Sequence, residues 1–159
     1  MARRKHHLDI ECVPTGYANG KATNAHLPKE QIIANAEEAF GKFLDALGCD
    51  WRNDPNSEDT PKRVAKAYVN DLWVGSFEDL PDITSFPADG RVIGLSKLNR
   101  VVEHFGRRGA IQEQLTTAIH QAVDKVCENN LGVIVTIVAS HDCVSCRGVK
   151  HKGAAMVTT

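Results

Sequence analysis

Residues 131–138 form an unbroken run rich in β-branched side chains, and no other stretch constrains the fold as strongly. The run is short and its composition is typical of a strand rather than a helix. A second strand is predicted over residues 148–158, with residues 141–147 as the hairpin connection. Two antiparallel strands do not make a stable domain, so further strands must come from elsewhere in the chain or from neighbouring subunits.

The spacing of apolar residues elsewhere predicts amphipathic helices. These helices are expected over residues 29–47, 59–73, 96–105 and 110–128. Gly48 stands where a glycine cap would end the first helix, and Ser96 is expected to cap the third. The last two helices can pack together on one sheet, which indicates an α+β domain.

The chain is expected to divide into three regions. Residues 1–28 show no periodicity and are predicted to be a flexible N-terminal arm. Residues 29–80 are expected to form an N-terminal helical region, and residues 81–159 to hold the sheet. The proline-punctuated stretch between Gly75 and Gly90 has no regular period and is interpreted as a connector.

Composition narrows the class of function. The 159 residues are 42% hydrophobic and 25% charged, which is ordinary for one globular domain. A net charge of -1 argues against nucleic acid as the main partner, and the basic N-terminus leads into no apolar stretch that suits a signal peptide or membrane anchor. Five cysteines without a secretory leader favour a reducing compartment, so we expect a cytoplasmic protein with free or metal-bound thiols.

The hairpin connection holds the densest cluster of chemically active side chains. His141 could move protons, Cys143 could ligate a metal as thiolate, and Arg147 could hold phosphate oxygens in its planar donor fork. On spacing alone, a site for a phosphorylated substrate and a merely solvated hairpin tip remain equally open.

Four blocks of sequence occur in a fixed order. They are Asp59-Thr60-Pro61-Lys62-Arg63-Val64-Ala65, Gly94-Leu95-Ser96-Lys97-Leu98-Asn99-Arg100, Arg107-Arg108 with Ile111-Gln112-Glu113-Gln114-Leu115, and His141-x-Cys143-x-x-x-Arg147-Gly148. Together they resemble the GTP cyclohydrolase I family, over roughly residues 30–159. The ordered set is far more specific than any single block.

The resemblance implies a tunnelling fold, in which an antiparallel sheet carries two helices on one face and follows an N-terminal helical region. Residues 81–159 would then be an incomplete tunnelling-fold catalytic domain. Family members hydrolyse GTP to formate and 7,8-dihydroneopterin triphosphate. They assemble into ring-like homo-oligomers, typically decamers, with active sites between subunits, so the implied partners are GTP and further copies of the chain.

The resemblance also implies the catalytic and metal-binding residues. Cys143 matches a zinc-ligating cysteine, and His141 matches a histidine that transfers protons. Ser96 lies where the family places a hydroxyl near the ribose. Zinc in such a site acts as a Lewis acid and lowers the pKa of its bound water.

The implied substrate-binding residues are of two kinds. Lys97, Arg100 and Arg147 match positions that hold the triphosphate, and Arg63 is a further candidate. Gln112 and Glu113 match the pair that recognises guanine. Without the resemblance, each charged residue in these sets would be read as part of a solvated helix face.

One departure from the family affects the metal. Family members carry a strand-loop-strand segment with a Cys-Glu-His-His motif, which supplies two more zinc ligands, before the Gly94–Arg100 block. Here Phe86-Pro87-Ala88 runs directly into Asp89-Gly90, and the motif is absent from the sequence. A local site built on Cys143, Cys146 and a nearby histidine is the remaining way to complete three ligands.

Three functions therefore stay open. The first is a zinc-dependent GTP cyclohydrolase I, and the second is a non-catalytic nucleotide-binding or structural paralogue that has lost the metal site. The third is a Cys-x-x-Cys redox or metal-storage protein. A gene that encodes Cys-Glu-His-His between Pro87 and Gly90 would favour the first, and a continuous reading through that junction would favour the second.

Overall fold

The computed structural model describes residues 4–6, 22–88, 90–127 and 129–159. It has a mixed α+β architecture and divides into two compact units. One unit contains Leu80–Gly106 and Ala110–Thr159 together with the N-terminal strand, and the other contains residues 22–79 with Arg107–Gly109. Among the described residues, no helix has the length and apolar character needed to cross a bilayer.

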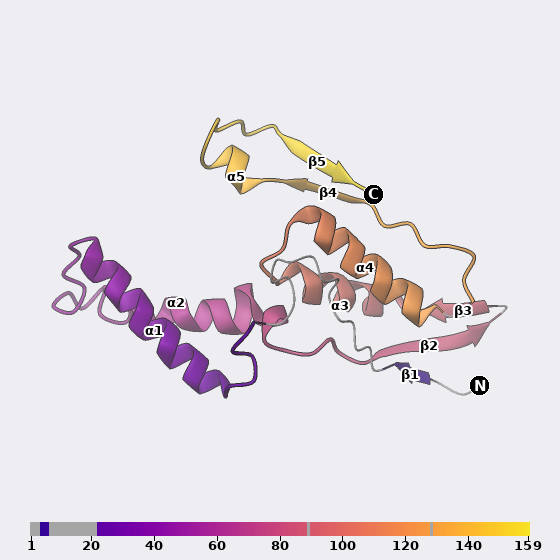
Figure 1. Cartoon of the computed structure of the whole chain (residues 1–159), viewed down its shortest axis with the longest axis horizontal. Coiled ribbons are helices and arrows are strands. Elements are labelled where there is room, and N and C mark those ends of the chain that lie inside the picture. Colours follow the sequence, from indigo (N-terminus) through magenta and orange to yellow (C-terminus); the bar gives the residue numbers. More distant parts are fainter. Residues whose placement is uncertain (1–3, 7–21, 89, 128) are drawn as a thin grey trace. The chain divides into compact units, whose positions relative to one another are not determined.

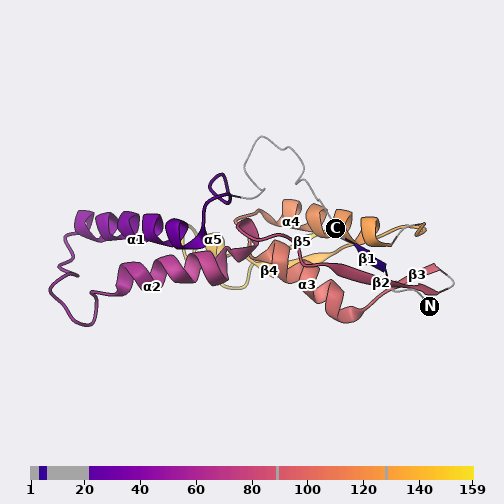
Figure 2. The ribbon, with the colours of Figure 1, turned by 90° about the horizontal axis from the view of Figure 1, so that it is seen from below.

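The second unit is helical. Helices α1 (Lys29–Ala46) and α2 (Thr60–Ala67) lie side by side, and α2 continues into a π-helical turn over Tyr68–Leu72 (Figures 1 and 2). Both helices agree with the apolar spacing of the sequence, and Gly48 has the positive φ of 74° that a glycine cap requires. A Cβ at Gly41 would lie 3.0 Å from the Trp51 ring, so a larger residue there would require the ring to shift.

The first unit begins with a three-stranded antiparallel sheet in the order β1-β2-β3. Its strands are β1 (Arg4–His6), β2 (Ile83–Ala88) and β3 (Gly90–Ile93). The central strand β2 lies within the stretch that the sequence predicts to be an irregular connector, so that prediction is wrong. Ile83, Thr84 and Ser85 on this strand are buried. The nearby prolines indicate an irregular stretch, but they do not prevent the strand, because Pro81 precedes it and Pro87 lies near its end.

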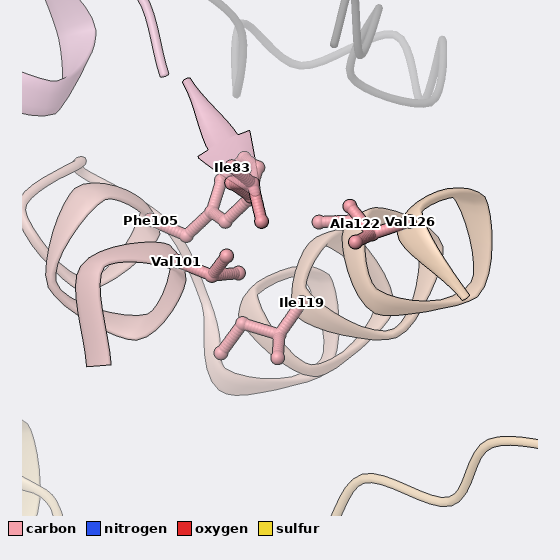
Figure 3. Packing of buried hydrophobic residues seen from close by; sticks show 6 residues of the cluster. All are labelled: Ile83, Val101, Phe105, Ile119, Ala122 and Val126. Atoms are coloured by element: carbon pink, nitrogen blue, oxygen red, sulfur yellow. The ribbon is translucent and has the colours of Figure 1, made fainter. Parts of the chain in front are cut away.

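Helices α3 (Leu95–Gly106) and α4 (Gln112–Val126) pack against β2. Figure 3 shows the side chains of this core pointing toward one another from the strand and both helices. They are Ile83, Val101, Phe105, Ile119, Ala122 and Val126. The last two helices do share one sheet, but it is not the predicted one: its three strands lie where no strand was expected, and the predicted strands form the separate pair β4–β5.

The C-terminal part of the first unit is a separate antiparallel pair, β4 (Ile137–Ser140) with β5 (Ala155–Thr158), joined through the short helix α5 (Asp142–Ser145) (Figure 1). Both strands are shorter than predicted, since 131–136 and 148–154 are not strands. Leu131 and Ile134 are almost fully exposed at 108% and 84%. A β-branched run without a neighbouring strand gains no ladder hydrogen bonds, which explains the difference.

Two smaller expectations are corrected. Ser96 is the second residue of α3 and not its cap, because the Gly94 carbonyl accepts the first helical hydrogen bond, 2.8 Å from the Lys97 nitrogen. The N-terminal arm predicted over 1–28 includes Arg4–His6, which pair with β2, and most of its other residues lie outside the described ranges.

Adjacent valines on α3 test the assignment of the core. Val101 is fully buried and Val102 is 48% exposed, so Val101→Ala should lower the free energy of unfolding by about 2 kcal/mol. Val102→Ala should change it by less than about 0.5 kcal/mol, because its methyl groups already meet water and alanine favours helix. Urea unfolding followed by circular dichroism measures both, and equal losses would show that the core is misassigned.

Candidate functional site

The site is built around Gln112, the first residue of α4, which is only 6% exposed. Its amide nitrogen Nε2 donates to two backbone carbonyls, Ile137 O and Met156 O, each at 3.0 Å. These carbonyls belong to β4 and β5, so one side chain connects the start of α4 to both strands of the pair. A buried amide must satisfy its donors in this way, because an unpaired one carries a desolvation penalty.

The amide oxygen of Gln112 lies 2.7 Å from Nε2 of His141. The neighbouring carbonyls fix which end of the amide is nitrogen, because only the NH₂ group can donate to two oxygens. The oxygen is therefore the acceptor, and Nε2 of His141 carries a proton. In the neutral ring, the lone pair then lies on Nδ1.

That second ring nitrogen faces Cys143, with 3.9 Å between Nδ1 and Sγ. His141 precedes α5 in an extended conformation, and its carbonyl accepts from Val144 and Ser145 at 2.9 Å. Beyond the helix, the His151 nitrogen donates to Val144 O at 3.0 Å. These backbone bonds fold the connection into a compact turn that places Cys143 beside the imidazole.

The remaining predicted residues of the first unit lie on or near the same elements. Glu113 follows Gln112 in the first turn of α4 and is exposed. Ser96 and Arg100 are exposed on α3 and Lys97 is half-buried there, with Lys97 and Arg100 one turn apart on the helix. Arg147 is exposed just after α5.

Arg63 belongs to the helical unit and has local partners. Its Nη2 donates to Asn56 O at 3.0 Å and to Thr60 Oγ1 at 3.1 Å. Of the nine residues named from the sequence, the structure thus joins Gln112, His141 and Cys143 by direct contacts. Among the described residues, no direct contact joins Gln112, His141 or Cys143 to Ser96, Lys97, Arg100 or Arg147.

The described residues do not fit a catalytic zinc ion. Nowhere in residues 4–6, 22–88, 90–127 and 129–159 do three His, Cys, Asp or Glu side chains gather as possible ligands. Cys143 and His141 offer two donors, one short of the three protein ligands usual for catalytic zinc. The local site that would add Cys146 or His151 is therefore not formed, and Cys146 Sγ instead lies 3.7 Å from Ser145 Oγ.

This arrangement suits proton transfer. The imidazole is held at one nitrogen by a buried amide and offers the other nitrogen beside a thiol. The sequence predicts all three side chains but not the two strand carbonyls that orient Gln112. Backbone carbonyls are present at every residue, so no sequence pattern could have singled these out.

Comparisons with known proteins point to one family. A family profile described as GTP cyclohydrolase I matches residues 75–159, more than half of the chain. A relative named GTP cyclohydrolase 1 from Streptococcus agalactiae is 35% identical over 162 residues, covering 77% of this chain and 84% of the relative. Another of that name from Streptococcus pyogenes is 32% identical over 177 residues, covering 84% and 88%.

A relative from Bacillus cereus, also named GTP cyclohydrolase 1, is 32% identical over 167 residues, covering 80% of this chain and 85% of the relative. The profile match and the shared identity over most of each sequence establish that the chain belongs to the GTP cyclohydrolase I family.

Proposed function

We propose that this protein hydrolyses GTP to formate and 7,8-dihydroneopterin triphosphate. The observation that carries the proposal is the Gln112–His141–Cys143 group, because it places a proton-transfer histidine beside a thiol in a member of this family. The relatives' name, GTP cyclohydrolase 1, supports the same reaction.

The fold proposed for the first unit is the tunnelling fold. Two helices, α3 and α4, pack on the sheet that contains β2, as that fold requires. The pair β4–β5 would extend the sheet once further strands join it. Val138 and Val157 support this, because they lie opposite each other in the pair and are 67% and 63% exposed.

Further strands can come from other copies of the chain, so we propose assembly into a ring-like homo-oligomer, with a decamer as the family's usual form. Within the described residues, β4 and β5 pair only with each other, which leaves the outer edge of each strand open. Open edges with exposed β-branched residues favour pairing with another chain. In such a ring, residues from neighbouring copies complete each site.

The triphosphate is proposed to bind to Lys97, Arg100 and Arg147, with Arg63 as a further contact. A triphosphate carries several negative charges, and charge-assisted hydrogen bonds from Arg and Lys are among the strongest that a protein makes. Lys97 and Arg100 present two such donors from one helix, and the Arg147 guanidinium is accessible to a ligand. Ser96, in the first turn of α3, is proposed to contact the ribose.

Guanine recognition is proposed to rest on the Glu113 side chain. A carboxylate can accept from the guanine N1–H and amino group together, and the Glu113 side chain is exposed. Gln112, the other residue of the implied pair, has both amide N–H groups and its oxygen engaged within the protein. Its amide is therefore not available to guanine in this arrangement.

His141 is proposed to accept and return protons through Nδ1 while the purine ring opens. The family resemblance implies zinc with Cys143 as one ligand. Because the described residues supply too few donors, we assign no step of the reaction to the metal. A complete zinc site would need donors that this set of residues does not contain.

This shortage of ligands favours a second candidate function, a paralogue that binds GTP without turning it over. The two functions share the triphosphate and guanine contacts and differ only in turnover. A Cys-x-x-Cys redox or metal-storage role is not supported by a described cluster of metal ligands.

A turnover assay distinguishes the two candidates. We expect the purified chain, supplied with zinc and GTP, to release formate and give a fluorescent pterin after oxidation. Intact mass must be recorded on the same sample. If the mass matches the 159 residues and no formate appears, the chain is the non-catalytic paralogue and the proposed reaction is wrong.

Removal of the Arg147 guanidinium should weaken GTP binding. Arg147→Ala should raise the dissociation constant by about 30-fold, equivalent to about 2 kcal/mol, if the guanidinium meets phosphate away from water. Titration calorimetry measures this change. Lys152→Ala is the matched control, since Lys152 is an exposed cation in the same connection and no role is assigned to it. Unchanged affinity in Arg147→Ala would remove Arg147 from the site.

Glu113→Gln should reduce the preference for GTP over ATP, because the amide replaces one of the two acceptor oxygens with an NH₂ donor that would face a guanine donor. Competitive binding of the two nucleotides measures that preference. Glu103→Gln, which changes an exposed carboxylate on α3, should leave it intact. The guanine assignment fails if Glu113→Gln retains the original ratio of affinities.

A further inference from the structure

We propose that Gln112 is a positioning residue, whose amide holds the His141 ring in one orientation and in the tautomer that leaves Nδ1 free. This role differs from the guanine contact that the family resemblance implies. It deepens the proposed function, on which its effect on turnover rests, but the hydrogen bonds that carry it do not depend on the substrate.

The Gln112 amide has a single possible orientation. With Nε2 toward β4 and β5, the amide gives both of its N–H groups to carbonyls at 3.0 Å. Reversal would bring Oε1 against Ile137 O and Met156 O, so three oxygens would face one another with no proton between them. Because Gln112 is 6% exposed, water has little access to relieve that repulsion.

The fixed amide oxygen determines the tautomer of His141. Oε1 is only an acceptor, so the short 2.7 Å contact requires a proton on Nε2 of His141. That proton is engaged, and the ring nitrogen able to exchange a proton is Nδ1, on the side of Cys143 Sγ. A free imidazole could place its proton on either nitrogen and rotate about its side-chain bonds, and the amide removes both freedoms.

The Gln112 amide has a structural role beyond the ring. It also fastens α4 to the strands on either side of the connection that carries His141. Loss of Gln112 could therefore act by loosening the strands rather than by freeing the ring. Variants that separate these two effects are needed to test the proposal.

Three variants separate them. Gln112→Leu removes both the donors and the acceptor. Gln112→Glu loses the donors to the strand carbonyls but keeps an oxygen for His141. The control is Thr116→Val, since Thr116 lies one turn along α4, is equally buried, and donates to Gln112 O at 2.8 Å without contacting His141.

The decisive readout is the tautomer of His141, measured from the ¹⁵N shifts of its ring nitrogens in histidine-labelled full-length protein, with the signal assigned through His141→Gln. We expect protonated Nε2 and bare Nδ1 in the wild type and in Thr116→Val, and protonated Nε2 in Gln112→Glu, where the carboxylate also favours a proton on Nδ1. Gln112→Leu should show a mixture of tautomers. A wild-type pattern in Gln112→Leu, or equal disturbance in Gln112→Leu and Gln112→Glu, would overturn the proposal.

Kinetics give a second readout where the chain turns over GTP. Gln112→Leu should lower kcat by about 100-fold and change KM by less than about threefold, because general acid–base catalysis depends on the ring. A raised KM with unchanged kcat would instead make Gln112 a guanine contact and overturn the proposal. Failure of the wild type to release formate would refute the proposed reaction and leave the tautomer test intact.

Discussion

The hydrogen bonds of the buried Gln112 amide are the interactions on which the site depends. Helix α4 is anchored in the core by Ile119, Ala122 and Val126, and its first residue reaches both strands of the C-terminal pair. In the described residues that pair has no third strand, and an isolated two-stranded pair is marginal in water. The amide therefore transmits the rigidity of the core to the connection that bears His141 and Cys143.

The parts of the fold that sequence reasoning predicted are those governed by local periodicity. Helix α1 has apolar residues at helical spacing and a glycine with positive φ just past its end, so its position follows from the chain itself. Strand β2 was missed because its three buried residues, Ile83–Ser85, include two with hydroxyl groups and show no alternation. Strands buried on both faces lack the alternation that marks half-exposed ones.

Residues 131–136 show the opposite error, a strand expected from composition that a single chain does not form. Valine and isoleucine favour a strand only when neighbours supply hydrogen bonds and packing, and Ile134 is 84% exposed here. The site was likewise predictable only in part. His141 and Cys143 could be recognised from their chemistry and order, whereas the partners of Gln112 depend on where two backbone carbonyls meet in space.

The junction at which the sequence predicts a departure from the family lies where two paired strands meet, so a change there would disturb the fold little. Ala88 pairs with Gly90 at the end of the antiparallel pair β2–β3. A strand-loop-strand segment inserted at that point would lengthen both strands of the hairpin and keep the register of Ser85 with Ile93. The helices α3 and α4, the core between them and the Gln112–His141 contact would all stay as they are. Loss or gain of the metal ligands can therefore be separated from the fold that positions the residues proposed to bind the nucleotide and to transfer protons.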